Sequence, residues 1–237
     1  MNFSDPHLFC AYNSSLLAQD ELQVAEHPIL GSLYESLVSS GKSPRTVDNE
    51  GRPTPITISG IQRRCAIHTR PNPEIGCPNG LYGNAFERAS EEQVIAATKS
   101  LSPPTISNIL AMAAPACGYG EYTRDEITYI VNTAFTGFSA ACQESDRIAG
   151  THSQTVIHTG FWGCGAFGGN RSLMTILQAL AADLADVDIE FWAGQDGGIA
   201  KDAHEIYERT LDTTLSVSQV LDELVRMKFQ WGESDGN

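Results

Sequence analysis

Residues 159–170 read TGFWGCGAFGGN, a loop with five glycines and three large aromatic side chains. Residues 155–158 before it form an apolar run that predicts a short buried strand, and residues 171–180 after it have apolar side chains at helical spacing. A strand, a glycine loop and a helix are how α/β proteins bind phosphate, because the backbone N–H groups and the helix dipole both attract an anion. The stretch therefore favours an α/β protein whose ligand contains phosphate.

The same pattern has a structural alternative, since a glycine-rich turn can simply connect a strand to a helix. The aromatic side chains Phe161, Trp162 and Phe167 argue against a plain turn, which normally contains small polar residues. No Gly-Lys-Ser/Thr sequence follows the loop, so a Walker-type nucleotide triphosphatase is excluded.

Composition predicts one domain spanning residues 1–237. The chain is 237 residues long and 41% hydrophobic, which is enough for one sizeable core. It has no apolar run of the ~20 residues that a transmembrane helix needs, and its first residues lack the pattern of a signal peptide. The six cysteines are scattered, at positions 10, 65, 77, 117, 142 and 164. Reduced thiols and an intracellular location, cytoplasmic or nuclear, are therefore expected.

The formal net charge of −14 argues against general nucleic-acid binding, which needs a basic surface. An anionic ligand would have to be held locally, by backbone amides and a few arginines. Arg63, Arg64 and Arg70 are the main basic cluster, and the sequence leaves open whether they face a ligand or balance nearby acids.

Strand and helix patterns alternate along the chain and predict an α/β sandwich with a mixed, largely buried sheet. The strands are predicted at residues 8–13, 56–59, 106–115, 155–158 and 187–194. The helices are predicted at residues 18–26, 29–38, 90–98, 123–138, 171–180, 200–211 and 216–229. Residues 70–83, rich in proline and glycine, predict a long irregular loop of the kind that is often functional.

Asp20 and Glu21 form the most prominent acid pair. Acids in a first helical turn often only complement the helix dipole. Alternatively, Glu21 is a general acid whose pKa is raised in a partly closed site, while Asp20 binds a hydroxyl group. Neighbouring helical residues point about 100° apart, so the two acids would have unlike roles.

Other candidate chemistry is weaker. Cys65, His68 and Cys77 lack the fourth ligand of a structural zinc site, so no metal and no cofactor are expected. Cys164 lies within the glycine loop, but no histidine motif accompanies it as the partner of a nucleophile.

The loop at residues 159–169 closely resembles the diphosphate loop of poly(ADP-ribose) glycohydrolases, whose catalytic domain has a macrodomain fold. The similarity continues through the following helix, residues 191–194 and residues 215–221, and it includes residues 132–138 upstream. Gln19-Asp20-Glu21 is similar to the Gln-Glu-Glu catalytic motif of that family, with aspartate in the middle. The resemblance implies a three-layer α/β/α sandwich.

The resemblance also implies a role for each matching residue. Glu21 would protonate the ribose oxygen that leaves the anomeric carbon of ADP-ribose, and Asp20 would hold a ribose hydroxyl. The residues implied in substrate binding are Gln19, Asn13, Gly163, Cys164, Gly165, Ala166, Phe167 and Phe191. Phe191 or Trp192 would replace an aromatic adenine platform that the family places where this chain has Ala193.

The activity implied is hydrolysis of ribose–ribose O-glycosidic bonds, with poly(ADP-ribose) or ADP-ribosylated proteins as partners and a monomer as the expected state. The chain departs from the family in having no glycine triplet at residues 14–18. Two alternatives therefore stay open: a module that binds ADP-ribose without cleaving it, and a hydrolase of a mono-ADP-ribosyl or other nucleotide ribose linkage.

Overall fold

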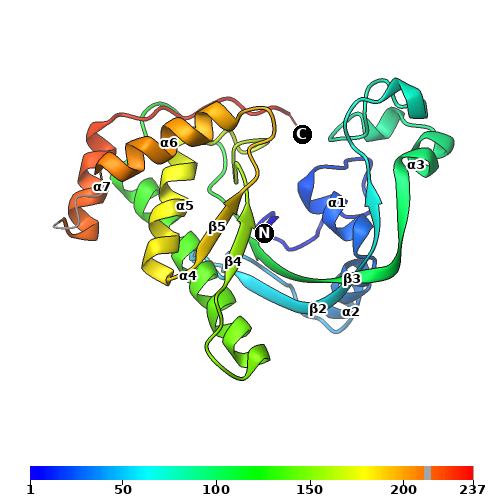
Figure 1. Ribbon diagram of the computed structural model, residues 1–237, viewed down its shortest axis with the longest axis horizontal. Coiled ribbons are helices and arrows are strands. Elements are labelled where there is room, and N and C mark those ends of the chain that lie inside the picture. The colour runs from blue at the N-terminus through cyan, green and yellow to red at the C-terminus, as the bar shows by residue number, and fades with distance from the viewer. Residues whose placement is uncertain (211–214, 237) are drawn as a thin grey trace.

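The computed structural model describes residues 1–210 and 215–236 (Figure 1). Its strands are β1 (Asn2–Phe3), β2 (Ile56–Ile67), β3 (Thr98–Met112), β4 (Val156–Thr159) and β5 (Asp188–Phe191). Its helices are α1 (Gln19–Glu26), α2 (Ile29–Ser39), α3 (Glu91–Ala97), α4 (Arg124–Ala149), α5 (Arg171–Ala185), α6 (Gly197–Thr210) and α7 (Val217–Arg226). Two short 3₁₀ turns lie at Pro73–Ile75 and Phe86–Arg88. The chain is thus a mixed α/β protein.

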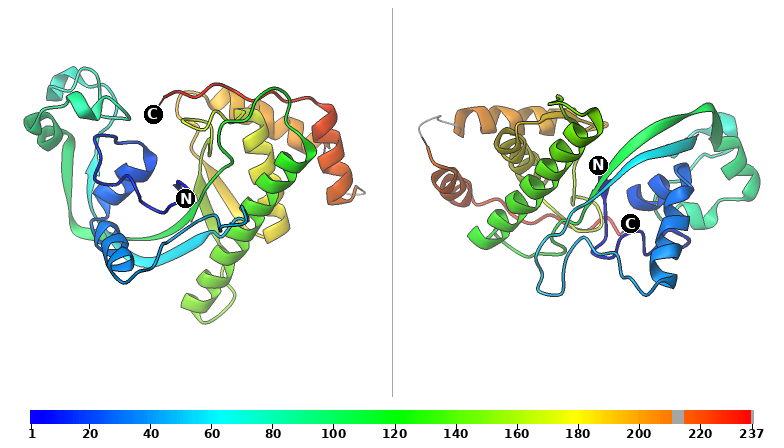
Figure 2. Two further views of the ribbon diagram at one scale, coloured as in Figure 1. Left: turned by 180° about the vertical axis from the view of Figure 1, so that it is seen from behind. Right: turned by 90° about the horizontal axis from the view of Figure 1, so that it is seen from below.

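The described strands form two sheets. One has the order β1-β3-β2, with β1 parallel and β2 antiparallel to β3, and the other pairs β4 with β5 in parallel. The predicted mixed sheet is therefore confirmed. The expectation that the sheet is largely buried is wrong for β2 and β3, because only the last residues of β3 are buried and the rest of this ribbon is partly or fully exposed. Figure 2 shows β2 and β3 curving as one long ribbon from α4 toward α3.

The main core lies between α4 and α5 and extends to β4, α6 and α7. Phe138 of α4 is fully buried in it, as is Trp162 at the start of the glycine loop. The Trp162 indole Nε1 donates to the backbone oxygen of Met112 at the end of β3, 3.1 Å away. This core therefore fixes the glycine loop against the carboxyl end of the longest strand.

Capping residues in the sequence define where several helices begin. Thr123 accepts a hydrogen bond from the Glu126 backbone at the start of α4, and Ser90 and Ser216 form the same capping box for α3 and α7. Asn170 caps α5 directly after the glycine loop. The direction in which each helix leaves its loop is thus fixed locally.

The predicted helices and four of the five predicted strands are confirmed, with shifted ends; Leu211, in the predicted helix 200–211, lies outside the described residues. The strand predicted at residues 8–13 is wrong. This segment consists of turns, in which Cys10 N donates to His7 O and Tyr12 N donates to Phe9 O. Leu8 and Phe9 are apolar because they are buried near α1 and α2, not because they pair in a sheet. No described helix is both long and apolar enough to cross a membrane.

The two phenylalanines of α4 test the position of the core. Replacing the fully buried Phe138 with alanine should lower the free energy of unfolding by about 3–5 kcal/mol, because it removes buried area and leaves a cavity. Phe135 of the same helix is 39% exposed, so Phe135→Ala should cost no more than about 1 kcal/mol. Urea unfolding followed by circular dichroism measures both values, and equal losses would contradict this placement of the core.

Candidate active site

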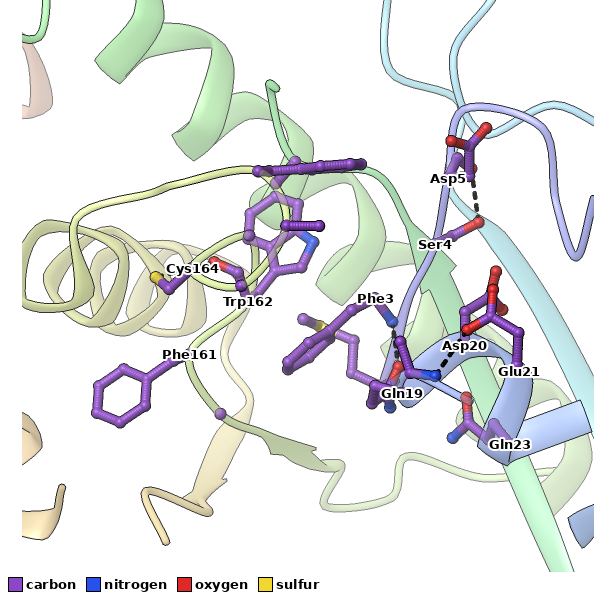
Figure 3. Close-up of a pocket in the computed structure, with 18 of the residues that line it drawn as sticks. Phe3, Ser4, Asp5, Gln19, Asp20, Glu21, Gln23, Phe161, Trp162 and Cys164 are labelled. Carbon is purple, nitrogen blue, oxygen red and sulfur yellow. Dashed lines mark hydrogen bonds between the residues drawn. The ribbon is translucent and has the colours of Figure 1, made fainter. Parts of the chain in front are cut away.

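A cavity of about 700 Å³ lies between α1 and the glycine loop (Figure 3). On one side are Gln19, Asp20 and Glu21 of α1, and on the other the loop residues that surround Trp162 and Cys164. Phe3 of β1 lies between them, and Asp5, two residues after this strand, lines the cavity on the side of α1. The acid pair and the glycine loop, more than 130 residues apart in the sequence, therefore face one cavity.

Gln19 fixes the orientation of α1. Its side-chain Oε1 accepts a hydrogen bond from Phe3 N at 2.8 Å, and its Nε2 donates to Met1 O at 2.9 Å. The side chain thus binds one backbone donor and one backbone acceptor of the β1 segment, as a neighbouring strand would. Both ends of the Gln19 amide are engaged with β1, so the side chain holds α1 against this strand. The role of Gln19 in orienting a ligand stays a prediction.

Asp20 and Glu21 are both buried, at 8% and 6% exposure. Burial is the main reason why the pKa of Asp20 is raised to about 7. A 2.9 Å hydrogen bond from Asn2 Nδ2 opposes this rise, and the carboxylates of Glu21 and Asp5 add to it. Burial also raises the pKa of Glu21, against the backbone N–H groups that bind it, among them Ala18 N at 3.0 Å. Both acids therefore hold a proton more tightly than carboxyl groups in water.

The glycine loop is shaped by close backbone approaches. Gly163 has a φ of +73°, and a Cβ there would lie 2.5 Å from the Cβ of Ala114, so only glycine fits. The fully buried Gln178 of α5 donates from Nε2 to Gly160 O and accepts at Oε1 from the Thr159 hydroxyl. These contacts hold the loop in one conformation before any ligand arrives.

Four backbone amides within residues 163–167 of this loop are available to a ligand. The backbone N–H groups of Gly163, Gly165, Ala166 and Phe167 make no hydrogen bond to any other described residue. Arg171, the first residue of α5, is the one Lys or Arg among the described residues that line the cavity. Its guanidinium lies 5.2 Å from the centre of the Phe161 ring and binds Asp196. An anion at this loop would thus be held chiefly by backbone amides near a helix N-terminus.

The cavity contains eight of the ten site residues expected from the sequence: Gln19, Asp20, Glu21, Gly163, Cys164, Gly165, Ala166 and Phe167. Asn13 and Phe191 do not line it. Asn13 lies exposed in the turns that replace the predicted strand. Phe191 packs edge-on against Phe161, with ring centres 5.3 Å apart, whereas its neighbour Trp192 lines the cavity and is 67% exposed.

Several lining residues escaped the sequence analysis. Asp5 lines the cavity and follows a strand of two residues, which is too short to produce a periodic pattern. Tyr82 lines the cavity from the end of the irregular loop at residues 70–83, whose length was the available signal. Asp235 gave no signal, because a polar stretch near a terminus resembles any solvated tail.

The remaining candidates lie elsewhere or are inert. Arg63 pairs with the buried Glu26 at 2.7 Å, away from the cavity, so it balances an acid. Burial raises the pKa of the Cys164 thiol to about 12, which suppresses the thiolate that a nucleophile requires.

Taken together, the fold and the cavity define an α/β protein in which a glycine loop with free backbone amides faces two buried acids across one cavity. Residues 80–201 match the family model described as poly(ADP-ribose) glycohydrolase, macro domain fold. That match covers half of the chain, and the chain therefore belongs to the poly(ADP-ribose) glycohydrolase family.

Two relatives from Caenorhabditis elegans are similar over shorter stretches. Poly(ADP-ribose) glycohydrolase 2 is 30% identical over 90 residues, which cover 38% of this chain and 17% of that protein. Poly(ADP-ribose) glycohydrolase 1 is 42% identical over 53 residues, which cover 22% of this chain and 7% of that protein. The matched segments thus span less than a fifth of either relative. The family match begins at residue 80, so the acid pair lies outside it.

The raised pKa of Asp20 predicts a pH-dependent stability. The folded state holds the proton up to about pH 7, whereas the unfolded chain loses it near pH 4. The contribution of Asp20 to the free energy of unfolding is therefore complete below pH 4 and is lost as the pH rises to 7. The loss amounts to roughly 4 kcal/mol, at about 1.4 kcal/mol per pKa unit. Urea unfolding of Asp20→Asn should show a smaller loss of stability between pH 5 and pH 8 than the wild type.

The exposed first-turn acid Asp125 of α4 provides the matched control. Asp125→Asn should retain the pH dependence of the wild type. Parallel profiles for wild type and Asp20→Asn would contradict the burial of a protonated Asp20.

Proposed function

We propose that this protein hydrolyses ribose–ribose O-glycosidic bonds of poly(ADP-ribose) and releases ADP-ribose. The observation that carries the proposal is the single cavity in which the acid pair of α1 faces the glycine loop. A diphosphate bound to the amides of Gly163–Phe167 would place the attached ribose in the space between the loop and α1. Membership of the poly(ADP-ribose) glycohydrolase family supports the same assignment.

In the proposed reaction, protonated Glu21 donates its proton to the ribose oxygen as the bond from that oxygen to the anomeric carbon breaks. The anomeric carbon acquires oxocarbenium character, which the nearby diphosphate stabilises electrostatically. Water then attacks this carbon and gives a proton to the Glu21 carboxylate, which restores the acid. The raised pKa of Glu21 supports this role, because a general acid must hold its proton near neutral pH.

Asp20 is proposed to bind a hydroxyl of the reacting ribose. Its carboxyl group accepts a hydrogen bond from Asn2, and its raised pKa means that it loses its proton less readily than an ordinary aspartate. A protonated Asp20 could donate to a hydroxyl oxygen as well as accept from the hydroxyl hydrogen. The two acids would therefore divide proton transfer and substrate positioning between them.

The proposal extends to the architecture and the setting of the protein. Met1 N donates to His158 O at 2.7 Å, which links β1 to β4 and supports a continuous strand order β2-β3-β1-β4-β5. We propose that these strands form the central layer of one macrodomain-like α/β/α unit spanning residues 1–237. The proposed substrates are poly(ADP-ribose) or ADP-ribosylated proteins, and the proposed state is an intracellular monomer.

Conversion of the proposed acid to its amide is the decisive test. Purified wild type and Glu21→Gln are incubated with labelled poly(ADP-ribose), and the products are separated. Glu21→Gln should release ADP-ribose at least ~100-fold more slowly, since it cannot donate a proton. It should bind ADP-ribose within about threefold of the wild type by calorimetry, because its shape is retained. Glu91→Gln, the same change at an exposed site in the first turn of α3, should leave turnover unaltered.

The outcomes separate the alternatives. Unchanged turnover in Glu21→Gln would refute the proposed acid. Binding of ADP-ribose without cleavage of polymer by the wild type, even at high protein concentration, would instead establish a reader module. Release of ADP-ribose from a singly modified protein but not from polymer would establish a hydrolase of the mono-ADP-ribosyl linkage.

We further propose that Trp192 stacks on the adenine ring. It is the exposed aromatic side chain next to the loop, with its Nε1 3.5 Å from His158 Nδ1. Base stacking on an aromatic ring contributes about 1–3 kcal/mol, so Trp192→Ala should weaken ADP-ribose binding about tenfold or more. Trp192→Phe keeps an aromatic face and should lose much less. Equal calorimetric affinities for Trp192→Ala and the wild type would rule out this platform.

A further inference from the structure

Residues 231–236 leave α7 and return across the molecule to the glycine loop. Figure 1 shows this segment in red, running past α6 along the top of the view and ending between β5 and the part of the chain that contains α3. It makes contacts with both sides of that cavity, and its Asp235 is one of the lining residues. We call residues 231–236 the strap.

The strap begins at a tight aromatic anchor. The Trp231 ring stacks on Tyr122, with centres 4.2 Å apart and planes inclined by 13°. A Cβ at Gly118 would lie 1.9 Å from Trp231 Cε2, so the indole occupies a slot that only glycine leaves open. The Tyr122 hydroxyl also accepts a hydrogen bond from Asn170 N at the start of α5. The anchor is thus attached to the same structure that holds the glycine loop.

The rest of the strap bridges the two sides of the cavity. Gly232 N donates to Gly168 O at 2.8 Å, and Asp235 N donates to Gly165 O at 3.4 Å. Asn84 Nδ2, two residues after the cavity-lining Tyr82, donates to Gly236 O at 2.6 Å. The strap therefore connects the glycine loop to the loop that contains Tyr82.

This course brings a carboxylate to the glycine loop. A Cβ built on Gly165 would lie 3.3 Å from Asp235 Oδ2 and 3.8 Å from both Cγ and Oδ1. Gly165 is one of the residues whose amide makes no hydrogen bond within the described structure. The side chain of Asp235 thus lies beside the place where backbone donors would receive an anion.

The charges of the cavity make this placement consequential. Asp5 and Asp235 line the cavity besides the protonatable pair Asp20 and Glu21, and the basic groups of the described lining include the guanidinium of Arg171 and the α-amino group of Met1. A diphosphate bound at the loop would add negative charge next to Asp235. Negative charges that lie next to each other repel, so a bound anion and the Asp235 carboxylate would compete for the same region of the cavity.

We propose that the strap is an autoinhibitory element in which Asp235 competes with the ligand's diphosphate for the glycine loop. Ligand binding displaces the Asp235 end of the strap, and the hydrogen bonds of Asp235 and Gly236 to the cavity walls break. The stacked Trp231 remains as the hinge. The identity of the nucleotide rests on the function proposed above, whereas the competition itself concerns any diphosphate.

The test removes the charge while keeping the shape. Calorimetric titration with ADP-ribose at low ionic strength compares the wild type, Asp235→Asn and Glu233→Gln, a matched charge removal in the strap outside the cavity lining. Asp235→Asn should bind about fivefold to tenfold more tightly than the wild type, and the gain should shrink at high salt. Glu233→Gln should bind as the wild type does.

Hydrogen exchange provides a second measurement that does not depend on a variant. Addition of ADP-ribose to the wild type should speed exchange of the Asp235 amide, because its bond to Gly165 O breaks. Equal or weaker binding by Asp235→Asn, or slower exchange at Asp235 on binding, would overturn the strap while leaving the proposed function intact.

Inorganic pyrophosphate distinguishes failure of the strap from failure of the proposed function. If neither protein binds ADP-ribose, the proposed function is wrong, and the pyrophosphate titration alone decides the strap. Tighter binding of pyrophosphate by Asp235→Asn supports the competition. Equal affinity, or no binding by either protein, refutes it.

Discussion

The geometry of the cavity depends on the pairing of one side-chain amide with a strand. Gln19 binds the backbone of β1 on both sides of Asn2, and Asn2 in turn holds the carboxyl group of Asp20. β1 lies parallel to β3 with Asn2 opposite Ala111, so the position of α1 is set by the longest strand of the protein. The same end of β3 holds Trp162 of the glycine loop. Acid and loop are therefore positioned against one shared element.

Burial of the two acids changes their protonation. Enclosing Asp20 and Glu21 raises their pKa values, because burial destabilises the charged form of each carboxyl group. With Arg171 as the one Lys or Arg in the described lining, the cavity offers an anion mainly uncharged donors. Fixed amides suit this purpose, because they need no reorganisation and no desolvation of a counter-charge.

Local pattern was sufficient for most of the elements. The spacing of apolar residues located α4 and α5, and three of the predicted helices begin at Ser90, Thr123 and Ser216, which the structure shows to be capping residues. Local pattern was misleading at residues 8–13, where the apolar composition reflects burial of Leu8 and Phe9 in a turn. It also missed β1, because two residues cannot produce an alternating pattern.

The sequence by itself determined the glycine loop, the helix after it, the acid pair at the start of α1 and the family to which these motifs point. Each of these is encoded within a few neighbouring residues, through backbone freedom, capping and periodic burial. Only the tertiary structure decided that the pair faces the loop, that Trp192 rather than Phe191 lines the cavity, and that Asp235 reaches Gly165. Such contacts join residues as far apart as Asn84 and Gly236, and no local pattern specifies which distant surfaces meet. They are fixed by the packing of the whole chain.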